Sequence, residues 1–163
     1  VILAILMITA IPPVTNSIAK SRKDTFATNA KNVINAVRTS MASGDVKNGS
    51  EECSYPAEGS AVKITITADA LKGLLERGGD KSSFGRAYND SYVIIYNKGG
   101  DKFEYYIAIT DKGSNGVATF TKESALTGSS IELGKASSIN GTFTPDGSGT
   151  ALATSKISTC TVS

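Results

Sequence analysis

Residues 1–43 read VILAILMITAIPPVTNSIAKSRKDTFATNAKNVINAVRTSMAS, and this stretch has two parts. Ten of the first eleven residues are apolar and none is charged, so the first part offers water no polar face. As a helix it would cover only about 16 Å, against the roughly 30 Å hydrocarbon core of a bilayer. We expect something other than the chain's own domain to bury its large apolar side chains. These are Val1, Ile2, Leu3, Ile5, Leu6, Ile8 and Ile11.

Two consecutive prolines follow this apolar part. Pro12 and Pro13 have no backbone N–H, so the carbonyls of Ile8 and Thr9 lose their helical hydrogen-bond donors. The sequence therefore predicts that the helix kinks or locally melts here. Because the chain opens on valine, we also expect residues upstream of Val1, which were either removed by processing or are not part of this sequence. If about ten more apolar residues preceded Val1, the length would suffice for a membrane span.

From residue 14 onward the pattern becomes amphipathic. Apolar residues recur mostly three or four positions apart, which is typical of one helical face, and the lysines and arginines lie off it. The face comprises Ile18, Phe26, Ala30, Val33, Ile34, Val37 and Met41. A globular domain should pack on this face, and Gly44 can adopt the left-handed conformation that ends many helices.

The predicted organisation is a helix over residues 1–43 and a globular head over residues 44–163. The helix divides into an apolar part, 1–13, and an amphipathic part, 14–43, and 163 residues leave room for one core. The net charge is +2, with 17 basic and 15 acidic residues. This balance argues against nucleic acid or an acidic membrane surface as a partner.

The head reads as a sheet with one small helix. Residues 92–96 and 103–109 are β-branched and aromatic and flank a Gly-rich turn, and 117–121 follows a second one, so we predict three antiparallel strands. We further predict a strand at 62–67 and a helix at 68–77 that carries Leu71. Three edge strands are expected near 131–133, 141–144 and 156–162, a helical turn at 122–126 and a connecting loop at 45–60.

Both faces of the strand at 92–96 carry apolar side chains. Tyr92, Ile94 and Tyr96 share one face, while Val93 and Ile95 share the other. A single helix can cover only one of these faces. We therefore expect another element, such as the helix that contains Leu71, to cover the second face.

The order of these features resembles that of type IV pilins and pseudopilins, in particular those of Gram-positive bacteria. The features on which this resemblance rests are the apolar start of the helix, the proline at the end of that apolar run and the amphipathic continuation. The string KSSFGRAY at residues 81–88, followed by a strand, a Gly-rich turn and EYYI at 104–107, is similar to the heads of such proteins. The family's Gly-Phe-Thr cleavage motif, closely followed by a glutamate, is not in this sequence. The resemblance implies an α+β, pilin-like fold, in which a long N-terminal helix packs on an antiparallel β-sheet head.

The resemblance also implies a function and a location. The expected role is that of a structural subunit of a type IV pilus at the cell surface, inserted in the cytoplasmic membrane before assembly. Its expected partners are other copies of itself and the pilus assembly machinery. Two alternatives stay open: a pseudopilin of a type II secretion or DNA-uptake machine, and a membrane-anchored surface binding module.

The two cysteines are Cys53 and Cys160, 107 residues apart. In a chain that looks exported we expect a disulfide between them, which would tie the C-terminus to the loop after the helix. The alternative is two separate buried thiols.

The chain offers little for catalysis. It contains no histidine, which removes the usual general base near neutral pH and the commonest zinc ligand. A Ser–Lys pair or a carboxylate pair is possible in principle, but no motif places Ser, Lys, Asp or Glu at a recognisable spacing. We therefore expect no enzyme, and we predict no cofactor, metal or small-molecule ligand. Asp111, Ser114 and Asn115 loosely resemble the start of a calcium loop, but Lys122 stands where its bidentate glutamate would be. We expect ordinary turn residues here. Glycosylation triplets begin at Asn48, Asn89 and Asn140.

Overall fold

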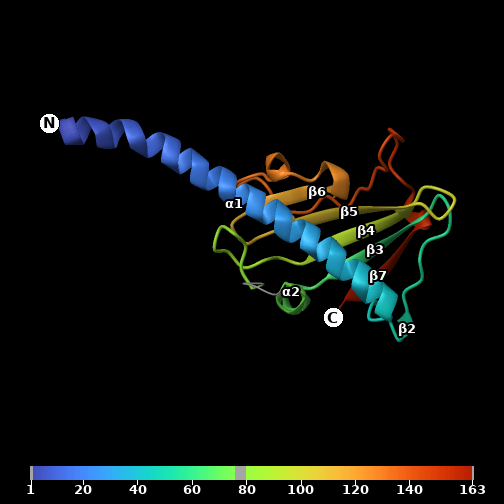
Figure 1. The fold of residues 1–163 in the computed structure, drawn as a ribbon. Helices are drawn as coiled ribbons and strands as arrows, with labels where there is room; N and C mark the ends of the chain where they lie inside the picture. The colour runs from blue at the N-terminus through green and yellow to red at the C-terminus, as the bar shows by residue number, and fades with distance from the viewer. Residues whose placement is uncertain (1, 76–79, 163) are drawn as a thin grey trace.

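The computed structural model describes residues 2–75 and 80–162, with the backbone alone for residues 2–15. One long helix, α1 (Ile2–Ser43), lies across a mixed β-sheet and extends well beyond it at its N-terminal end (Figure 1). The other helices are α2 (Ala68–Leu74), η1 (Glu123–Ala125), η2 (Gly128–Ser130) and η3 (Thr154–Lys156). The strands are β1 (Lys47–Asn48), β2 (Glu51–Glu52), β3 (Ala61–Ile66), β4 (Ser91–Asn97), β5 (Phe103–Thr110), β6 (Gly116–Lys122) and β7 (Ile157–Val162).

The helix α1 continues without interruption through Pro12 and Pro13. The predicted local melting is therefore wrong. Two prolines remove only two of the helix's hydrogen bonds, and the turns on either side hold the backbone helical. Figure 1 shows the first, dark blue turns of α1 running at an angle to the rest of its axis.

The C-terminal end of α1 follows the prediction. Gly44 adopts a positive φ of 76°, and its N–H donates to the carbonyl of Met41. The N–H of Asp45 donates to the carbonyl of Ser40, 2.9 Å away. These two bonds form a Schellman motif, which satisfies carbonyls that a helix end otherwise leaves free.

The sheet order is β2-β1-β7-β3-β4-β5-β6. The predicted meander of β4, β5 and β6 is present, and β3 extends it in antiparallel register with β4. The expectation of a wholly antiparallel sheet is wrong, because β7 runs parallel to β3, from the pair Ala61↔Ile157 to the pair Ile66↔Val162. A long connection precedes β7, so no hairpin forces it to run antiparallel.

The C-terminal strands also differ from expectation. β7 lies inside the sheet between β1 and β3, not at an edge. Residues 131–133 contribute only an isolated bridge, from Glu132 to Gly116, and residues 141–144 form no strand. The predicted loop at 45–60 contains the short hairpin of β1 and β2, and the predicted turn at 122–126 is η1. The second helix, predicted at 68–77, is shorter than expected, because α2 ends at Leu74 and Leu75 has an extended backbone.

One face of the sheet packs on α1. Six of the seven residues of the amphipathic face are buried in this main core: Phe26, Ala30, Val33, Ile34, Val37 and Met41. The sheet contributes Val93 and Ile95 from β4, as their alternation predicts. Ile18 was expected on the same face but is 47% exposed, because it precedes the part of α1 that lies over the head.

The other face of the sheet holds a second, smaller core. Ile94, Tyr106 and Phe143 are buried there, with Leu152 packed against them. The segment that contains Phe143 and Leu152 thus covers this face, whereas Leu71 of α2 belongs to the main core. The expectation that α2 covers the second face is wrong. Three rings meet Phe143 edge to face, namely those of Tyr96, Tyr106 and Phe120.

Candidate functional site

The first feature with functional potential is the start of α1, which projects beyond the head (Figure 1). The predicted apolar residues from Ile2 to Ile11 lie on this part, which the structure describes as helical backbone, and Val1 lies outside the described residues. None of the helices in the described parts of the chain has the length and apolar character that crossing a membrane requires.

The head holds α1 through aromatic packing near the point where the helix meets the sheet. The ring of Phe26 lies 5.7 Å from that of Tyr88 and 6.2 Å from that of Phe84, centroid to centroid. The hydroxyl of Ser83 donates to the backbone carbonyl of Arg22 at 2.7 Å. Phe84 and Tyr88 belong to the KSSFGRAY segment, which therefore braces α1 just where it leaves the head.

A second contact that braces α1 lies near its C-terminal end, at Arg38, five residues before Ser43. Arg38 Nη1 donates to Glu123 Oε1 at 2.9 Å, and Nη2 forms an ion pair with the same carboxylate. The guanidinium also lies 4.2 Å from the ring centroid of Tyr105. The hydrogen bond to Glu123 raises the pKa of Arg38, and the Coulomb attraction adds to this. Such a bidentate pair, stacked on a ring, has a defined geometry that a lysine could not reproduce.

The disulfide between Cys53 and Cys160 is present, with the two Cα atoms 6.1 Å apart, so this prediction is confirmed. It joins the segment after β2 to β7, and Lys47 of β1 pairs with Thr161 beside it. The bond thus fixes the last strand to the hairpin that follows α1.

Asp111 organises the turn between β5 and β6. Its side chain is buried, and its Oδ1 accepts hydrogen bonds from the N–H groups of Gly113 and Asn115 at 2.8 and 3.0 Å. Its Oδ2 accepts one from the Ser82 hydroxyl at 2.6 Å. Protein donors thus occupy this carboxylate, in keeping with a turn residue. No cluster of three or more His, Cys, Asp or Glu side chains suited to a metal occurs in the described residues.

Lys122, which stands where a calcium loop would have its glutamate, forms ion pairs with two acidic side chains. Its Nζ lies 2.6 Å from Glu104 Oε2 and 3.2 Å from Asp146 Oδ2. The Glu104 side chain is only 10% exposed, and burial raises its pKa, but the hydrogen bond and the charge of Lys122 outweigh this, so the pKa lies below its ordinary value. The Tyr106 hydroxyl donates to Glu104 and accepts from the N–H of Asp146. Burial raises the pKa of Tyr106 to about 12.

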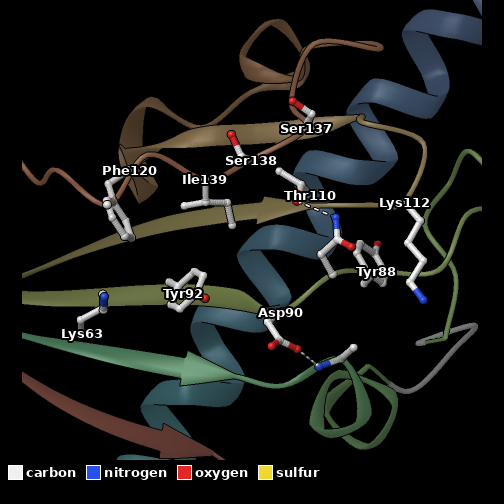
Figure 2. Close-up of a pocket in the computed structure, with 13 residues that line it drawn as sticks. Lys63, Tyr88, Asp90, Tyr92, Thr110, Lys112, Phe120, Ser137, Ser138 and Ile139 are labelled. Carbon is white, nitrogen blue, oxygen red and sulfur yellow. Dashed lines mark hydrogen bonds between the residues drawn. The ribbon is translucent and has the colours of Figure 1, made fainter.

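The second face of the sheet is left partly open and forms a hollow of about 590 Å³. Figure 2 shows Tyr92, Phe120 and Ile139 gathered in it, with Lys63 and Lys112 on opposite sides. Sequence reasoning missed this hollow. The outward positions of Lys63, Tyr92 and Phe120 in their strands were a signal, but only the pairing of the four strands β3 to β6 brings these residues together.

The glycosylation triplets occupy unlike surroundings. Asn48 lies at the exposed tip of the β1–β2 hairpin. Asn140 is also exposed, and its Oδ1 accepts from the N–H of Thr142. Asn89 instead donates through Nδ2 to Thr110 Oγ1 and to the carbonyl of Asp111.

The chain was compared with protein-family models, with curated proteins and with solved structures, and none of the three comparisons found a match.

Proposed function

We propose that this protein is a structural subunit of a pilin-type helical filament at the cell surface. Copies assemble by bundling the apolar starts of their α1 helices, and the heads face outward. The observation that carries the proposal is the division of a single helix, whose later part forms the core of the head while its earlier, apolar part projects away from it.

The physical argument concerns the burial of residues 1–11. Each isoleucine or leucine that leaves water contributes about 1.5–3 kcal/mol, and this stretch contains six of them. Bundling several copies can therefore offset the loss of freedom when a subunit joins. An interface that joins unlike faces of identical copies and does not close produces a filament.

The head is attached to α1 in a way that suits a subunit held in a filament by its helix. Its contacts with α1 lie at both ends of the overlap, at Phe26 and at Arg38, and the disulfide closes the last strand onto the first hairpin. In this proposal the assembly machinery of the membrane is the second partner, and the subunit resides in the cytoplasmic membrane before it joins the filament.

Microscopy of surface material tests the proposal. Filaments sheared from cells should bind a gold-labelled antibody to the head along their whole length. Label confined to short stubs would favour the pseudopilin, and label on the envelope without filaments would favour the membrane-anchored module.

A further inference from the structure

The hollow on the second sheet face is the feature that the filament proposal leaves unused. The segment around Phe143 and Leu152 packs against Ile94 and Tyr106 on this face, and Phe120 borders both this core and the hollow. The hollow is lined by strands β3 to β6, by the start of α2 and by residues 137–141. Its volume, about 590 Å³, lies within the range of small-molecule sites.

The lining combines an apolar floor with several hydroxyl groups that have no partner among the described residues. Tyr92, Phe120 and Ile139 are half-buried, so each presents part of an apolar surface to the hollow. The hydroxyls of Tyr92, Ser137 and Ser138 make no hydrogen bond to the described residues. An apolar surface beside free hydroxyls fits a ligand that has an apolar face and hydroxyls at its rim.

The charges of the hollow are mainly positive. Lys63 and Lys112 form no ion pair within the described parts of the chain. Lys63 Nζ lies 5.3 Å from the Tyr92 ring centroid, a cation–π contact that keeps the ammonium beside the floor. Among the described residues, Asp90 is the one carboxylate in the lining, and its Oδ1 already accepts from the N–H of Ala68 at 2.8 Å.

We propose that this hollow binds an anionic sugar, a pyranose that carries a carboxylate. The apolar C–H face of the ring lies on Tyr92 and Phe120, the carboxylate accepts from Lys63 or Lys112, and the ring hydroxyls meet Ser137 and Ser138. The proposal does not depend on filament assembly, because every residue it uses belongs to the head.

Saturation-transfer NMR on the full chain, with glucuronate and glucose as probes, tests this site. The two sugars differ in a carboxylate, so glucuronate should give the stronger transfer and the lower Kd. Replacing both lysines, Lys63→Gln with Lys112→Gln, should weaken glucuronate binding by about ten-fold or more, since either ammonium can supply the charge-assisted bond to the carboxylate and the double variant removes both. Lys102→Gln, at the exposed β4–β5 turn, is the matched control and should leave the Kd unchanged.

The stacking surface has its own variant pair. Tyr92→Leu removes the ring and should abolish detectable transfer from glucuronate, whereas Tyr92→Phe keeps it and should retain most of the affinity. No transfer from either sugar would overturn the proposal. Equal binding of glucose and glucuronate, or a Kd that the double lysine variant leaves unchanged, would overturn it as well.

Discussion

Gly116 sits where three elements meet: the end of β5, the start of β6 and the ring of Phe26 on α1. Its φ is +135°, a conformation that residues with a side chain rarely adopt. A Cβ at this position would overlap the carbonyl oxygen of Ile109 and lie 2.9 Å from Thr110 Cα and 3.0 Å from Phe26 Cζ. The glycine thus permits the turn and the approach of α1 at the same time.

We predict that Gly116→Ala lowers the free energy of unfolding by about 3 kcal/mol, from backbone strain and overpacking together. Chemical denaturation measures it. Gly73→Ala is the matched control, because a Cβ there meets no atom within 4 Å and alanine favours a helix by up to about 1 kcal/mol. If the two variants unfold at the same denaturant concentration, the packing around Gly116 is not as described.

Glu104 makes the stability depend on pH. Its pKa is lower in the folded protein than its ordinary value of 4.5. A carboxyl of this kind stabilises the fold fully above its unfolded pKa, and the contribution is lost as the pH falls through the folded pKa. We therefore predict that stability declines below about pH 4.5 and that Glu104→Gln makes the decline shallower.

Denaturation curves from pH 3 to 7 check this prediction. Glu58→Gln is the control, because Glu58 is exposed and lies on the connecting loop. A decline that is equally steep in Glu104→Gln and in the unmodified chain would show that other carboxyls cause it.

At the scale of elements, the amphipathic face of α1 is the part of the core that the sequence predicts best. Apolar side chains that recur three and four positions apart share one face of a helix, so the periodicity predicts which side chains are buried. The failure at Ile18 is instructive: periodicity says which face is apolar, but not where the domain beneath it begins.

We predict that Val33→Asp or Val37→Asp unfolds a soluble variant that lacks residues 1–13. Both valines are fully buried, and an unpaired buried carboxylate costs several kcal/mol against a typical stability of about 5–15 kcal/mol. Asn32→Asp adds the same charge to the exposed side of α1 and should leave the circular dichroism unchanged. If the valine variants melt like the chain with both valines, the amphipathic face of α1 is not part of the core.

The disulfide is the second prediction at this scale. Reduction should lower the free energy of unfolding by up to about 4.7 kcal/mol, because it releases a closed loop of more than a hundred residues in the unfolded chain. Denaturation with and without reductant measures the loss. A variant with both Cys53→Ser and Cys160→Ser should not respond to reductant, and two thiols that alkylate freely in the folded chain would contradict the pairing.

The parts of the fold that escaped prediction depend on contacts distant in sequence. The hairpins β4–β5 and β5–β6 were predictable because Gly-rich turns specify them locally. The parallel place of β7 beside β3 has no local signal, since any free sheet position would satisfy its backbone. Phe143 likewise lies in a segment of serine, threonine and glycine, and its role as a lid on the second face depends on rings contributed by three separate strands.

At the scale of the whole molecule, the two candidate sites are the projecting start of α1 and the hollow on the head, and we propose a different function for each. The projecting start of α1 was predictable from an apolar run without charge. The hollow was not, because its floor is assembled only when β3, β4 and β6 take their places in one sheet. The helix governs assembly in our proposal, and the head governs what the assembled surface touches.

The direct test of this division is electron microscopy of the full chain with single lysines in the apolar part. Ile5→Lys and Ile8→Lys each place a charge where a bundled helix offers neither water nor a partner. Asn32→Lys is the matched control on the exposed side of the same helix. We predict that both isoleucine variants keep a folded head but form no filaments, and that the control forms them normally. Normal filaments from the isoleucine variants, or from a chain beginning at Thr15, would contradict assembly through the apolar part of α1.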